Sequence, residues 1–524
     1  MSLRKQSFIQ GAMILLAAGL LNRLLGFVPR IALPRMVGAE GVGLIQLVFP
    51  FTIVLLTLIS GGIPLAVAKL VAEADSKGDS AGVRRILNIA ITISVSISLV
   101  AAAVCLALSD FISTQIMTDP RVRTAFLAMI PILPLVAVSS VWRGYFQGKQ
   151  NMVPTAISQT TETIFRIVFT LLLAGLLLPY GLEAAAAGGV MGMAVGEFAG
   201  LLVLWRQFVL ERRKESEPQQ PPPSHAPAKS YARDLLSTAI PVTGSKMIGS
   251  LSYLLESILT VRSLTIAGIA AAGATAQYGA LQGMVIPLLL LPGALTYSLA
   301  VSLVPSLSEA ASRGDWPAIR ARLHQSMKLA VITGAPFVVL LALLAAPVCK
   351  LLYGDDSMAP MLRWMAPLAI FLYMQSPLQA ALQALNRPGT ALFNTFAGAA
   401  VKLVLIARLA TDPDLGIAGV VAAIGVNMTL VTLLHWISVS RLTGFRMRPF
   451  DFLKVTAAMM IMSAATLRIW EFDWFGPHAA NLAAAAASGI AVYLLLLFPL
   501  RLIDREDIAR LPFFGRFLSP RNPS

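Results

Sequence analysis

Ser76-Lys77-Gly78-Asp79 returns 236 residues later as Ser312-Arg313-Gly314-Asp315. The same spacing aligns further pairs on both sides of this stretch: Gln46 with Gln282, Glu73 with Glu309, Arg84 with Arg320, Gln147 with Gln383 and Arg166 with Lys402. Two copies of one unit therefore make up roughly the first 440 residues. In a membrane protein such a duplication indicates a transporter, because two similar bundles can move against each other around a shared site.

The composition places the chain in a lipid bilayer. Apolar residues make up 57% of the 524 residues, charged residues make up 13%, and the mean hydropathy is +0.75. A soluble domain of this size does not expose so much apolar surface. Runs of about 20 apolar residues can cross roughly 30 Å of hydrocarbon as helices. We predict an all-α integral membrane protein, since the runs lack the residue alternation of a lipid-facing barrel.

About fourteen such runs occur, and a transmembrane helix is predicted over each. Their approximate spans are 8–36, 43–68, 86–109, 124–148, 153–179, 182–208, 232–262, 276–305, 325–349, 361–385, 389–410, 415–440, 452–470 and 478–500. The predicted fold is two pseudo-symmetric six-helix lobes plus two C-terminal helices.

The domain organisation follows from these spans. The predicted segments are an N-terminal lobe at 1–210, a Pro-rich cytoplasmic linker at 211–230, a C-terminal lobe at 231–440, the last two helices at 441–500 and a basic cytoplasmic tail at 501–524. The run of three prolines at 221–223 is typical of a linker rather than a site.

Lys and Arg are unevenly distributed between the two sets of loops. If the N-terminus is cytoplasmic, the inner loops and both termini, with Arg4 and Lys5, hold most of them. This bias predicts a multi-pass membrane protein with its N-terminus and C-terminus in the cytoplasm. It also accounts for much of the net charge of +15 without a nucleic-acid partner, because basic loops lie against anionic lipid.

Charged residues inside the predicted helices mark the candidate site, because hydrocarbon disfavours them. Arg23 lies about fifteen residues into the first helix, roughly 22 Å from its cytoplasmic end. We expect it to bind an anion in a water-filled cavity; the alternative is a guanidinium satisfied by neighbouring carbonyls. Arg30, two turns further on, extends the cationic stripe or snorkels to the interface. The other candidate binding residues are Arg166, Lys246, Lys402, Gln46 and Gln282.

Glu162 and Arg166 lie four residues apart in one predicted helix, a spacing that allows an ion pair. In the second copy Lys402 matches Arg166, but Gly398 stands in place of Glu162. Two interpretations of Arg166 therefore stay open: a neutralised pair, or one of two cations related by the repeat.

The candidate coupling residues are Glu162, Glu197, Glu256 and Asn394. Glu197 has no charged partner on its own helix, so it either exchanges a proton during transport or pairs with a cation on a neighbouring helix. Asn394 is a candidate cation ligand, although no acid follows it one turn later. Arg143, near the cytoplasmic end of its helix, is predicted to be an interfacial anchor.

The sequence carries no sign of an enzyme. Its four histidines are scattered, no Gly-rich phosphate loop precedes a helix, and the outer loops are too short for a catalytic domain. Cys105 and Cys349 have no ligand-type spacing. We therefore expect no catalytic residue, no metal site and no cofactor, with Na⁺ or a proton as the candidate coupling ion.

The first helix and the repeated loop resemble a known family. Arg23-Leu24-Leu25-Gly26-Phe27, then Arg30, Pro34-Arg35-Met36-Val37-Gly38 and the 76–79 loop are similar to the multidrug, oligosaccharidyl-lipid and polysaccharide (MOP) exporter superfamily. Within it, the chain resembles the stage V sporulation protein B family of polysaccharide transporters, relatives of the lipid II flippases. The resemblance covers the whole chain, including the two final helices that twelve-helix drug exporters lack.

The resemblance implies a protein of the bacterial cytoplasmic membrane with a V-shaped pair of six-helix lobes. It also implies alternating access for an undecaprenyl-diphosphate-linked glycan. Arginines that line the central cavity of lipid II flippases map onto Arg23 and Arg30, and the last two helices would form a lateral groove for the lipid tail. Two features depart from the pattern. The spacing between these arginines is one residue longer, and Gln46 and Gln282 stand where flippase relatives can carry cations.

Charge and resemblance together predict the function. A diphosphate that crosses a low-dielectric interior needs fixed cations around it, and cations outnumber acids inside the predicted helices. We predict a flippase for lipid II or a related precursor in spore cortex peptidoglycan synthesis, with the lipid bilayer and cell-wall synthesis enzymes as partners. The alternatives are a cation-coupled multidrug antiporter, which needs acids instead, and a non-transporting membrane scaffold for cell-wall synthesis.

Overall fold

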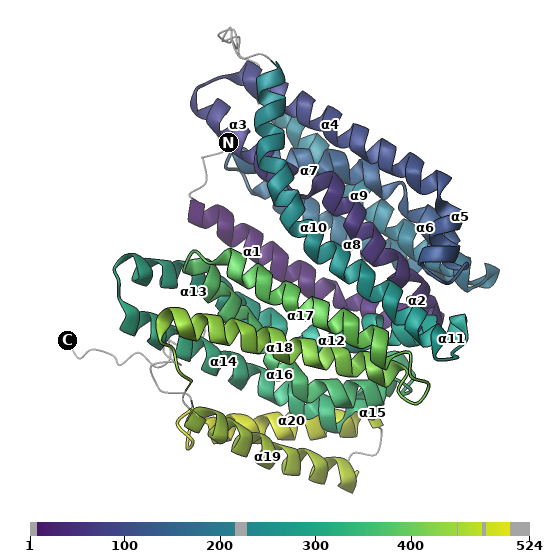
Figure 1. Cartoon of the computed structure of the whole chain (residues 1–524), viewed down its shortest axis with the longest axis vertical. Coiled ribbons are helices and arrows are strands. Elements are labelled where there is room, and N and C mark those ends of the chain that lie inside the picture. Colours follow the sequence, from purple (N-terminus) through teal and green to yellow (C-terminus); the bar gives the residue numbers. More distant parts are fainter. Residues whose placement is uncertain (1–7, 215–227, 448, 474–477, 503–524) are drawn as a thin grey trace. The chain divides into compact units, whose positions relative to one another are not determined.

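The computed structural model describes residues 8–214, 228–447, 449–473 and 478–502. Within these ranges the chain consists of helices and short connections, without a strand, and every predicted span is mostly helical (Figure 1). The predicted all-α fold is confirmed. Arg4, Lys5, most of the predicted linker 211–230 and nearly all of the tail 501–524 lie outside the described residues.

The first copy of the repeat folds into the helices up to α9. They are α1 Phe8–Leu25, α2 Phe27–Ser60, α3 Ile63–Ser76, α4 Ser80–Ala107, α5 Ser109–Phe111, η1 Ile112–Ile116, α6 Val122–Met129, α7 Ile132–Gly148, α8 Val153–Leu177, η2 Leu178–Tyr180 and α9 Leu182–Lys214. A kink at Gly38 separates two predicted spans within α2; its φ of 67° suits a residue without a side chain.

The second copy and the two C-terminal helices follow. They are α10 Ala228–Ile266, α11 Ala271–Gly279, η3 Ala280–Val285, α12 Ile286–Leu290, α13 Gly293–Ser312, α14 Trp316–Leu343, α15 Ala345–Tyr353, α16 Ala359–Ala384, α17 Pro388–Leu409, α18 Ile417–Thr443, α19 Pro449–Phe472 and α20 His478–Leu497.

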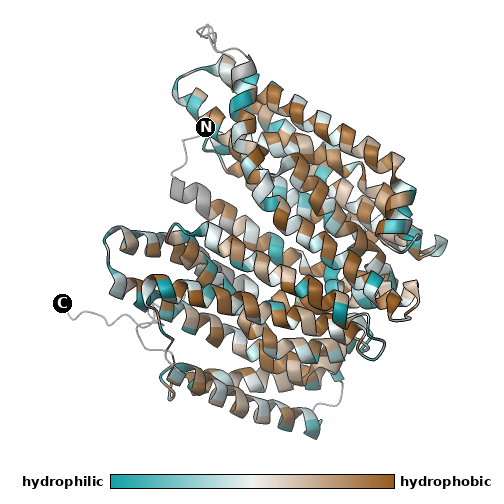
Figure 2. Cartoon of the chain, in the orientation of Figure 1, coloured by the Kyte–Doolittle hydropathy of each residue, from teal (hydrophilic) through white to brown (hydrophobic). Residues whose placement is uncertain are grey.

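Ten helical stretches among the described residues are long and apolar enough to cross a membrane, so the predicted number of fourteen is not confirmed. One of the ten, Met13–Ser76, contains two predicted spans. The predicted spans 276–305, 232–262 and 361–385 are not among the ten: the first is interrupted by a π-helix, and α10 carries Lys246 and Glu256. Apolar residues dominate most of the long helices, and many hydrophilic residues gather near helix ends (Figure 2).

The repeat is visible in the local backbone. Gly78 and Gly314 both have a positive φ, of 70° and 67°. The next residue in each copy, Asp79 or Asp315, caps a helix by accepting a hydrogen bond from the N–H three residues later, at 2.7 Å and 3.0 Å. An ion pair four residues apart precedes the turn in each copy and measures 2.7 Å in both. The duplicated sequence therefore folds into the same turn twice.

Contacts within the chain divide it into two units. Unit 1 comprises Met1–Met284 and Leu403–Val420, and unit 2 comprises Val285–Lys402 and Val421–Ser524. A buried core of unit 1 lies between α3, α4, α7 and α10, and one of unit 2 between α14, α16, α19 and α20. Close packing holds such helices together in lipid, where apolar burial alone gives little driving force. The predicted lobe boundaries stay a prediction.

In unit 1, α2 crosses α11 at a pair of glycines. A Cβ on Gly43 would lie 2.1 Å from the carbonyl oxygen of Thr275, and one on Gly279 would lie 2.2 Å from that of Ala39. The repeat matches Gly43 with Gly279 and Ala39 with Thr275. The two copies therefore meet here, and each glycine packs against the backbone at matching positions of the other copy.

Candidate functional site

The arginines of the first predicted helix flank a break in it. Arg23 lies in the last turn of α1, and α2 begins at Phe27 after Gly26. Arg23 and Arg30 are both exposed, and the Arg30 guanidinium lies 5.7 Å from the centroid of the Phe27 ring. The carbonyls at a helix C-terminus favour a nearby cation such as Arg23. Anion binding by these arginines stays a prediction.

Three predicted site residues gather next to the α2–α11 crossing. Gln282 of η3 donates a hydrogen bond from Nε2 to Oε1 of Glu256 on α10, at 2.9 Å. Glu256 is buried, and Gln282 is half-buried. Gln46 of α2 lies beside them, since a Cβ on Gly283 would be 3.5 Å from Gln46 Nε2. The structure thus joins the predicted coupling residue Glu256 to the predicted binding residue Gln282 and places Gln46 next to Gly283.

A second group of side chains forms an ion cluster between α7, α8 and α9. Arg143 Nη2 on α7 lies 2.8 Å from Glu162 Oε2 on α8 and 3.3 Å from Glu197 Oε1 on α9. Arg166 Nη1 lies 2.9 Å from Glu162 Oε1, and Ser139 donates a hydrogen bond to Glu197. The side-chain exposure rises from 8% at Glu197 to 41% at Arg166. Two acids and two cations balance, which limits the cost of burying them.

Small residues on α9 allow this cluster to form. Glycines recur every four residues along the face of α9 that meets α8: Gly188, Gly192, Gly196 and Gly200. A Cβ on Gly196 would lie 2.8 Å from the carbonyl oxygen of Glu162. Such spacing lets two membrane helices approach closely. It brings Glu197 near Glu162, and Arg143 offsets the repulsion between the two acids.

These contacts decide between several sequence-based interpretations. Glu197 pairs with a cation on a neighbouring helix, and the Glu162–Arg166 pair is present. Arg143, predicted to be an interfacial anchor, binds two carboxylates, and its side chain is only 19% exposed. Its depth in the membrane stays a prediction. Roles of these residues in coupling or in substrate binding stay predictions.

Lys246 contacts the end of another helix. Its Nζ lies 2.7 Å from the carbonyl oxygen of Gly61, the residue that follows α2. Thr243 Oγ1, one turn earlier on α10, accepts a hydrogen bond from the N–H of Gly62 at 3.0 Å. Both groups satisfy backbone atoms that the break between α2 and α3 leaves open. Lys246 thus caps a helix here, and its predicted contact with substrate stays a prediction.

Lys402 lies half-buried on α17, one turn after Gly398. A Cβ on Gly398 would lie 2.8 Å from Asn427 Oδ1 of α18. An acid matching Glu162 therefore has no room at this position, which explains why the Glu162–Arg166 pair has no counterpart beside Lys402.

Asn394 links α17 to α18. Its Nδ2 donates a hydrogen bond to Ser438 Oγ at 3.0 Å. The matching residue of the first copy, Ser158, likewise donates across to the next helix, to the carbonyl of Gly200 at 2.9 Å. Among the described residues, no group of three or more His, Cys, Asp or Glu side chains is placed to hold a metal ion.

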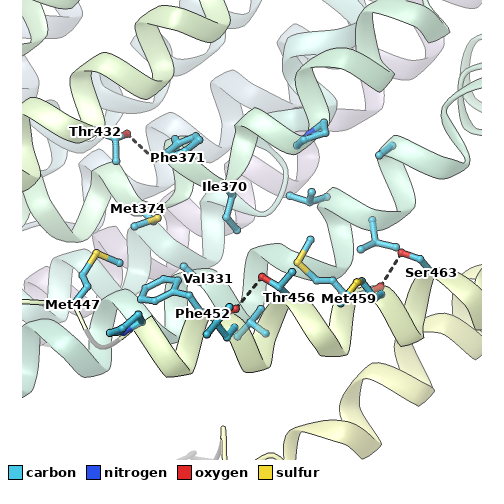
Figure 3. A pocket seen from close by; sticks show the side chains of 18 of the residues that line it. Val331, Ile370, Phe371, Met374, Thr432, Met447, Phe452, Thr456, Met459 and Ser463 are labelled. Carbon is cyan, nitrogen blue, oxygen red and sulfur yellow. Dashed lines mark hydrogen bonds between the residues drawn. The ribbon is translucent and has the colours of Figure 1, made fainter.

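Unit 2 contains a large apolar groove of about 960 Å³ between α14, α16, α18 and α19. Val331, Ile370, Met374, Phe452 and Met459 are among its lining residues (Figure 3). Its hydroxyl groups are turned to backbone carbonyls: Thr432 to Phe371 at 2.8 Å, Thr456 to Phe452 at 2.9 Å and Ser463 to Met459 at 2.7 Å (Figure 3). The groove therefore offers an aliphatic and aromatic surface to an occupant.

The resemblance implied a lateral groove made by the last two helices. In the structure α19 lines the large groove, whereas α20 lines a smaller one of about 280 Å³ with α14 and α15. Occupancy by a lipid tail stays a prediction.

Sequence reasoning missed a polar cluster at the end of unit 1 where α2, α6 and α11 meet. Asp119 Oδ2 lies 2.7 Å from Thr275 Oγ1 and 2.8 Å from Arg121 Nη2. Arg121 also binds Glu40. Burial acts to raise the pKa of Asp119, but hydrogen bonds from Arg121 and Thr275 outweigh it and lower that pKa. A signal in the sequence is the difference between the copies, since Ser357 stands at the position that matches Arg121.

Comparison with known proteins identifies the family. Residues 8–311 match the family described as "Polysaccharide biosynthesis protein". The chain is 39% identical over 515 residues to Stage V sporulation protein B of Bacillus subtilis (strain 168), an alignment that covers 98% of this chain and 99% of that protein. The family suspected from the first helix and the repeated loop is therefore confirmed.

Two further comparisons concern flippases. The chain is 27% identical over 541 residues to the protein named Lipid II flippase MurJ of Bacillus subtilis (strain 168), covering 97% of this chain and 98% of that one. It also resembles a solved structure of "Lipid II flippase MurJ, inward closed conformation", with a TM-score of 0.71, 16% identity and coverage of 94% of this chain and 99% of that one. That likeness establishes the fold alone.

Proposed function

The chain belongs to the polysaccharide biosynthesis protein family, and we propose that it flips an undecaprenyl-diphosphate-linked glycan across the cytoplasmic membrane by alternating access. The glycan is that of lipid II or a related cell-wall precursor, and the process it serves is spore cortex peptidoglycan synthesis. The observation that carries this proposal is the similarity over nearly the whole chain to a sporulation protein and to a lipid II flippase.

The charged end of the substrate is assigned to the arginines at the α1–α2 break. A diphosphate carries several negative charges, and an arginine can bind two of its oxygens at once. Arg23 and Arg30 are exposed, so both can reach a ligand without first breaking a buried core. Gln46 and Gln282 supply amide groups that suit sugar hydroxyls.

The lipid tail is assigned to the groove of unit 2. An isoprenoid chain offers no hydrogen bonds, and the hydroxyls of the groove are turned away to backbone carbonyls.

The remaining parts of the proposal concern membrane, partners and energy. The chain is a multi-pass membrane protein; the cytoplasmic membrane, cytoplasmic termini and contacts with cell-wall synthesis enzymes are proposed. We further propose that it is not an enzyme and needs no cofactor. Na⁺ or a proton drives the cycle, with Glu162, Glu197, Glu256 and Asn394 as candidates for coupling.

Transport by one preparation of proteoliposomes tests the proposal. The proposal expects movement of a fluorescent polyprenyl-diphosphate glycan between leaflets and no movement of a cationic dye. Dye transport without glycan movement would identify a drug antiporter. Transport of neither, by protein that is folded and inserted, would favour the scaffold.

A further inference from the structure

α2 and α11 cross at one end of unit 1 (Figure 1). The polar cluster adjoins this crossing, because Thr275 belongs to both. Asp119 sits in the turn before α6, and its side chain is 1% exposed. It accepts hydrogen bonds from Thr275 on α11 and from Arg121, which in turn reaches Glu40 on α2. A chain of contacts thus runs from α11 through the 119–121 turn to α2. It holds in place the helices that cross at Gly43 and Gly279.

The matching turn of the second copy lacks this chain of contacts. Asp355 matches Asp119 and makes the same local turn: its Oδ1 accepts from the N–H two residues later at 2.9 Å, against 3.1 Å at Asp119. Asp355 is nevertheless exposed, and its Oδ2 accepts from the hydroxyl of Ser357 in its own turn at 2.7 Å. Both copies therefore have this turn, but only Asp119 of the first copy hydrogen-bonds to a residue on another helix.

The partners of Asp119 are also replaced by other residues at the matching positions. Arg121, Thr275 and Glu40 match Ser357, Ala39 and Ala276. The two alanines have no side-chain group that hydrogen-bonds, and Ser357 contacts only the aspartate of its own turn. A fully symmetric crossing therefore carries an asymmetric set of polar contacts, which a purely structural turn does not require.

We propose that Asp119, Arg121, Thr275 and Glu40 form a latch that holds α11 against α2 and keeps the outer end of the transport path closed. With cytoplasmic termini, the 119–121 turn faces outward, as do the kink of α2 and the start of α11. The latch parts, and α11 leaves α2 at Gly43, when the path opens outward. The inference rests on the proposed function, since only an alternating-access transporter needs a gate at this end.

The charges around the latch agree with this role. Asp119, Arg121 and Glu40 are its titratable groups, and hydrogen bonding to Asp119 and Glu40 raises the pKa of Arg121. α11 contributes a neutral hydroxyl and carries no charged side chain. The neighbouring Arg123 is occupied by Asp110 at 2.7 Å, so it does not compete for Asp119. Asp119 is therefore the buried acid of the latch, and Thr275 is its neutral hydrogen-bond donor. Removing the Thr275 hydroxyl weakens the latch without changing any charge.

Cysteine labelling tests the latch. Val42 is 3% exposed in the crossing, where a Cβ on Gly283 would lie 2.2 Å from its Cγ1. In full-length protein with Cys105→Ala and Cys349→Ala, Val42→Cys reports on the crossing through its reaction with a membrane-impermeant maleimide added outside intact cells. Thr275→Val is expected to raise the labelling rate about tenfold, the factor that corresponds to one lost hydrogen bond to a charged group.

A matched control removes a hydroxyl that hydrogen-bonds to Asp355, the counterpart of Asp119. Ser357→Ala deletes the 2.7 Å contact to Asp355, as Thr275→Val deletes the 2.7 Å contact to Asp119, and it should leave the labelling rate unchanged. The latch would be overturned if Val42→Cys were labelled at the same rate with and without Thr275→Val. It would also be overturned if Ser357→Ala raised the labelling rate as much as Thr275→Val, or if labelling occurred only from the cytoplasmic side. The labelling needs no substrate, so an error in the proposed substrate would not imitate any of these results.

A cross-link gives a second, independent test. Val42→Cys combined with Gly283→Cys places two thiols within reach of a disulfide across the crossing. Oxidation should stop glycan flipping, and a reductant should restore it, whereas binding of polyprenyl diphosphate should persist. Continued flipping by fully cross-linked protein would show that the crossing does not part, and it would overturn the proposal.

Discussion

Gly43 and Gly279 occupy matching positions of a 236-residue repeat and lie against each other where α2 crosses α11. A Cβ on Gly279 would lie 2.4 Å from the backbone nitrogen of Gly43, closer than any side chain tolerates. Two matching residues can touch only where the two copies meet, so this contact marks the join between them. It also fixes the distance between the two helices at the end that we assign to the outer gate.

A methyl group at this crossing should destabilise the protein. Gly43→Ala would force a Cβ to 2.1 Å from a backbone oxygen, which cannot move without shifting α11. We expect a loss of about 1–3 kcal/mol, typical of overpacking, seen as a lower thermal midpoint in detergent. Gly244→Ala on α10 is the control, since a Cβ there meets nothing within 4 Å, and it should be neutral or slightly stabilising. Equal midpoints for Gly43→Ala and Gly244→Ala would contradict the geometry.

The repeat made much of the fold predictable. The repeated 76–79 stretch indicated two copies of one unit, and the structure shows that both copies form the same capped turn. The length of the apolar runs predicted helix in every span. The number of spans was harder to predict, because hydropathy does not reveal where a helix kinks, as at Gly38, or where a π-helix interrupts it, as at 280–285.

The candidate site was predictable only within single helices. The Glu162–Arg166 pair followed from a spacing of four residues, but the contact of Arg143 with Glu162 and Glu197 joins three helices. Such contacts depend on how closely the helices pack, which the glycines of α9 determine here. The positions of charged residues along the sequence do not show which helices pack together. For the same reason the sequence did not reveal that Asp119 reaches Thr275, 156 positions away.

The ion cluster predicts the effect of Glu197→Gln. Arg143 would keep Glu162 but lose its second carboxylate, so we expect a loss of stability of about 1–3 kcal/mol. Glu183→Gln, at the exposed start of the same helix, should have little effect. Thermal midpoints and the pH dependence of flipping, measured on one preparation, separate structure from coupling. An unchanged midpoint with a flattened pH profile would instead assign Glu197 to proton coupling.

The latch predicts a flat response to external pH in the physiological range. The pKa of Asp119 is lowered in the folded protein. The stability that ionised Asp119 gives the latch is therefore fully present above its unfolded pKa of about 3.9, and it is lost as the pH falls through the lower folded pKa. Maleimide is unsuitable at low pH, so Val42→Cys labelling should be followed with a methanethiosulfonate reagent, corrected with an exposed cysteine. The corrected rate should stay constant from about pH 8 to pH 5 and rise only below about pH 4. A rise between pH 7 and pH 5 would mean that another group controls the crossing.

The apolar groove predicts a dependence on lipid chain length. Ala342→Trp places an indole in the groove, so it should slow flipping of a long-chain polyprenyl substrate by about tenfold and leave a short-chain analogue nearly unaffected. Ala486→Trp, in the smaller groove beside α20, is the matched control and should spare both substrates. Equal slowing of long and short chains would show that the groove does not hold the tail.

Flipping of a fluorescent polyprenyl-diphosphate glycan by purified protein in liposomes tests the central claim most directly. A membrane-impermeant quencher bleaches only the outer leaflet, so complete bleaching reports exchange between leaflets. We predict complete bleaching with wild-type protein. Arg23→Lys should keep partial activity, because lysine keeps the charge but cannot bind two phosphate oxygens at once as arginine does, and Arg23→Ala should keep very little. Bleaching confined to the outer leaflet with folded wild-type protein would contradict the flippase assignment, and normal flipping by Arg23→Ala would remove Arg23 from the site.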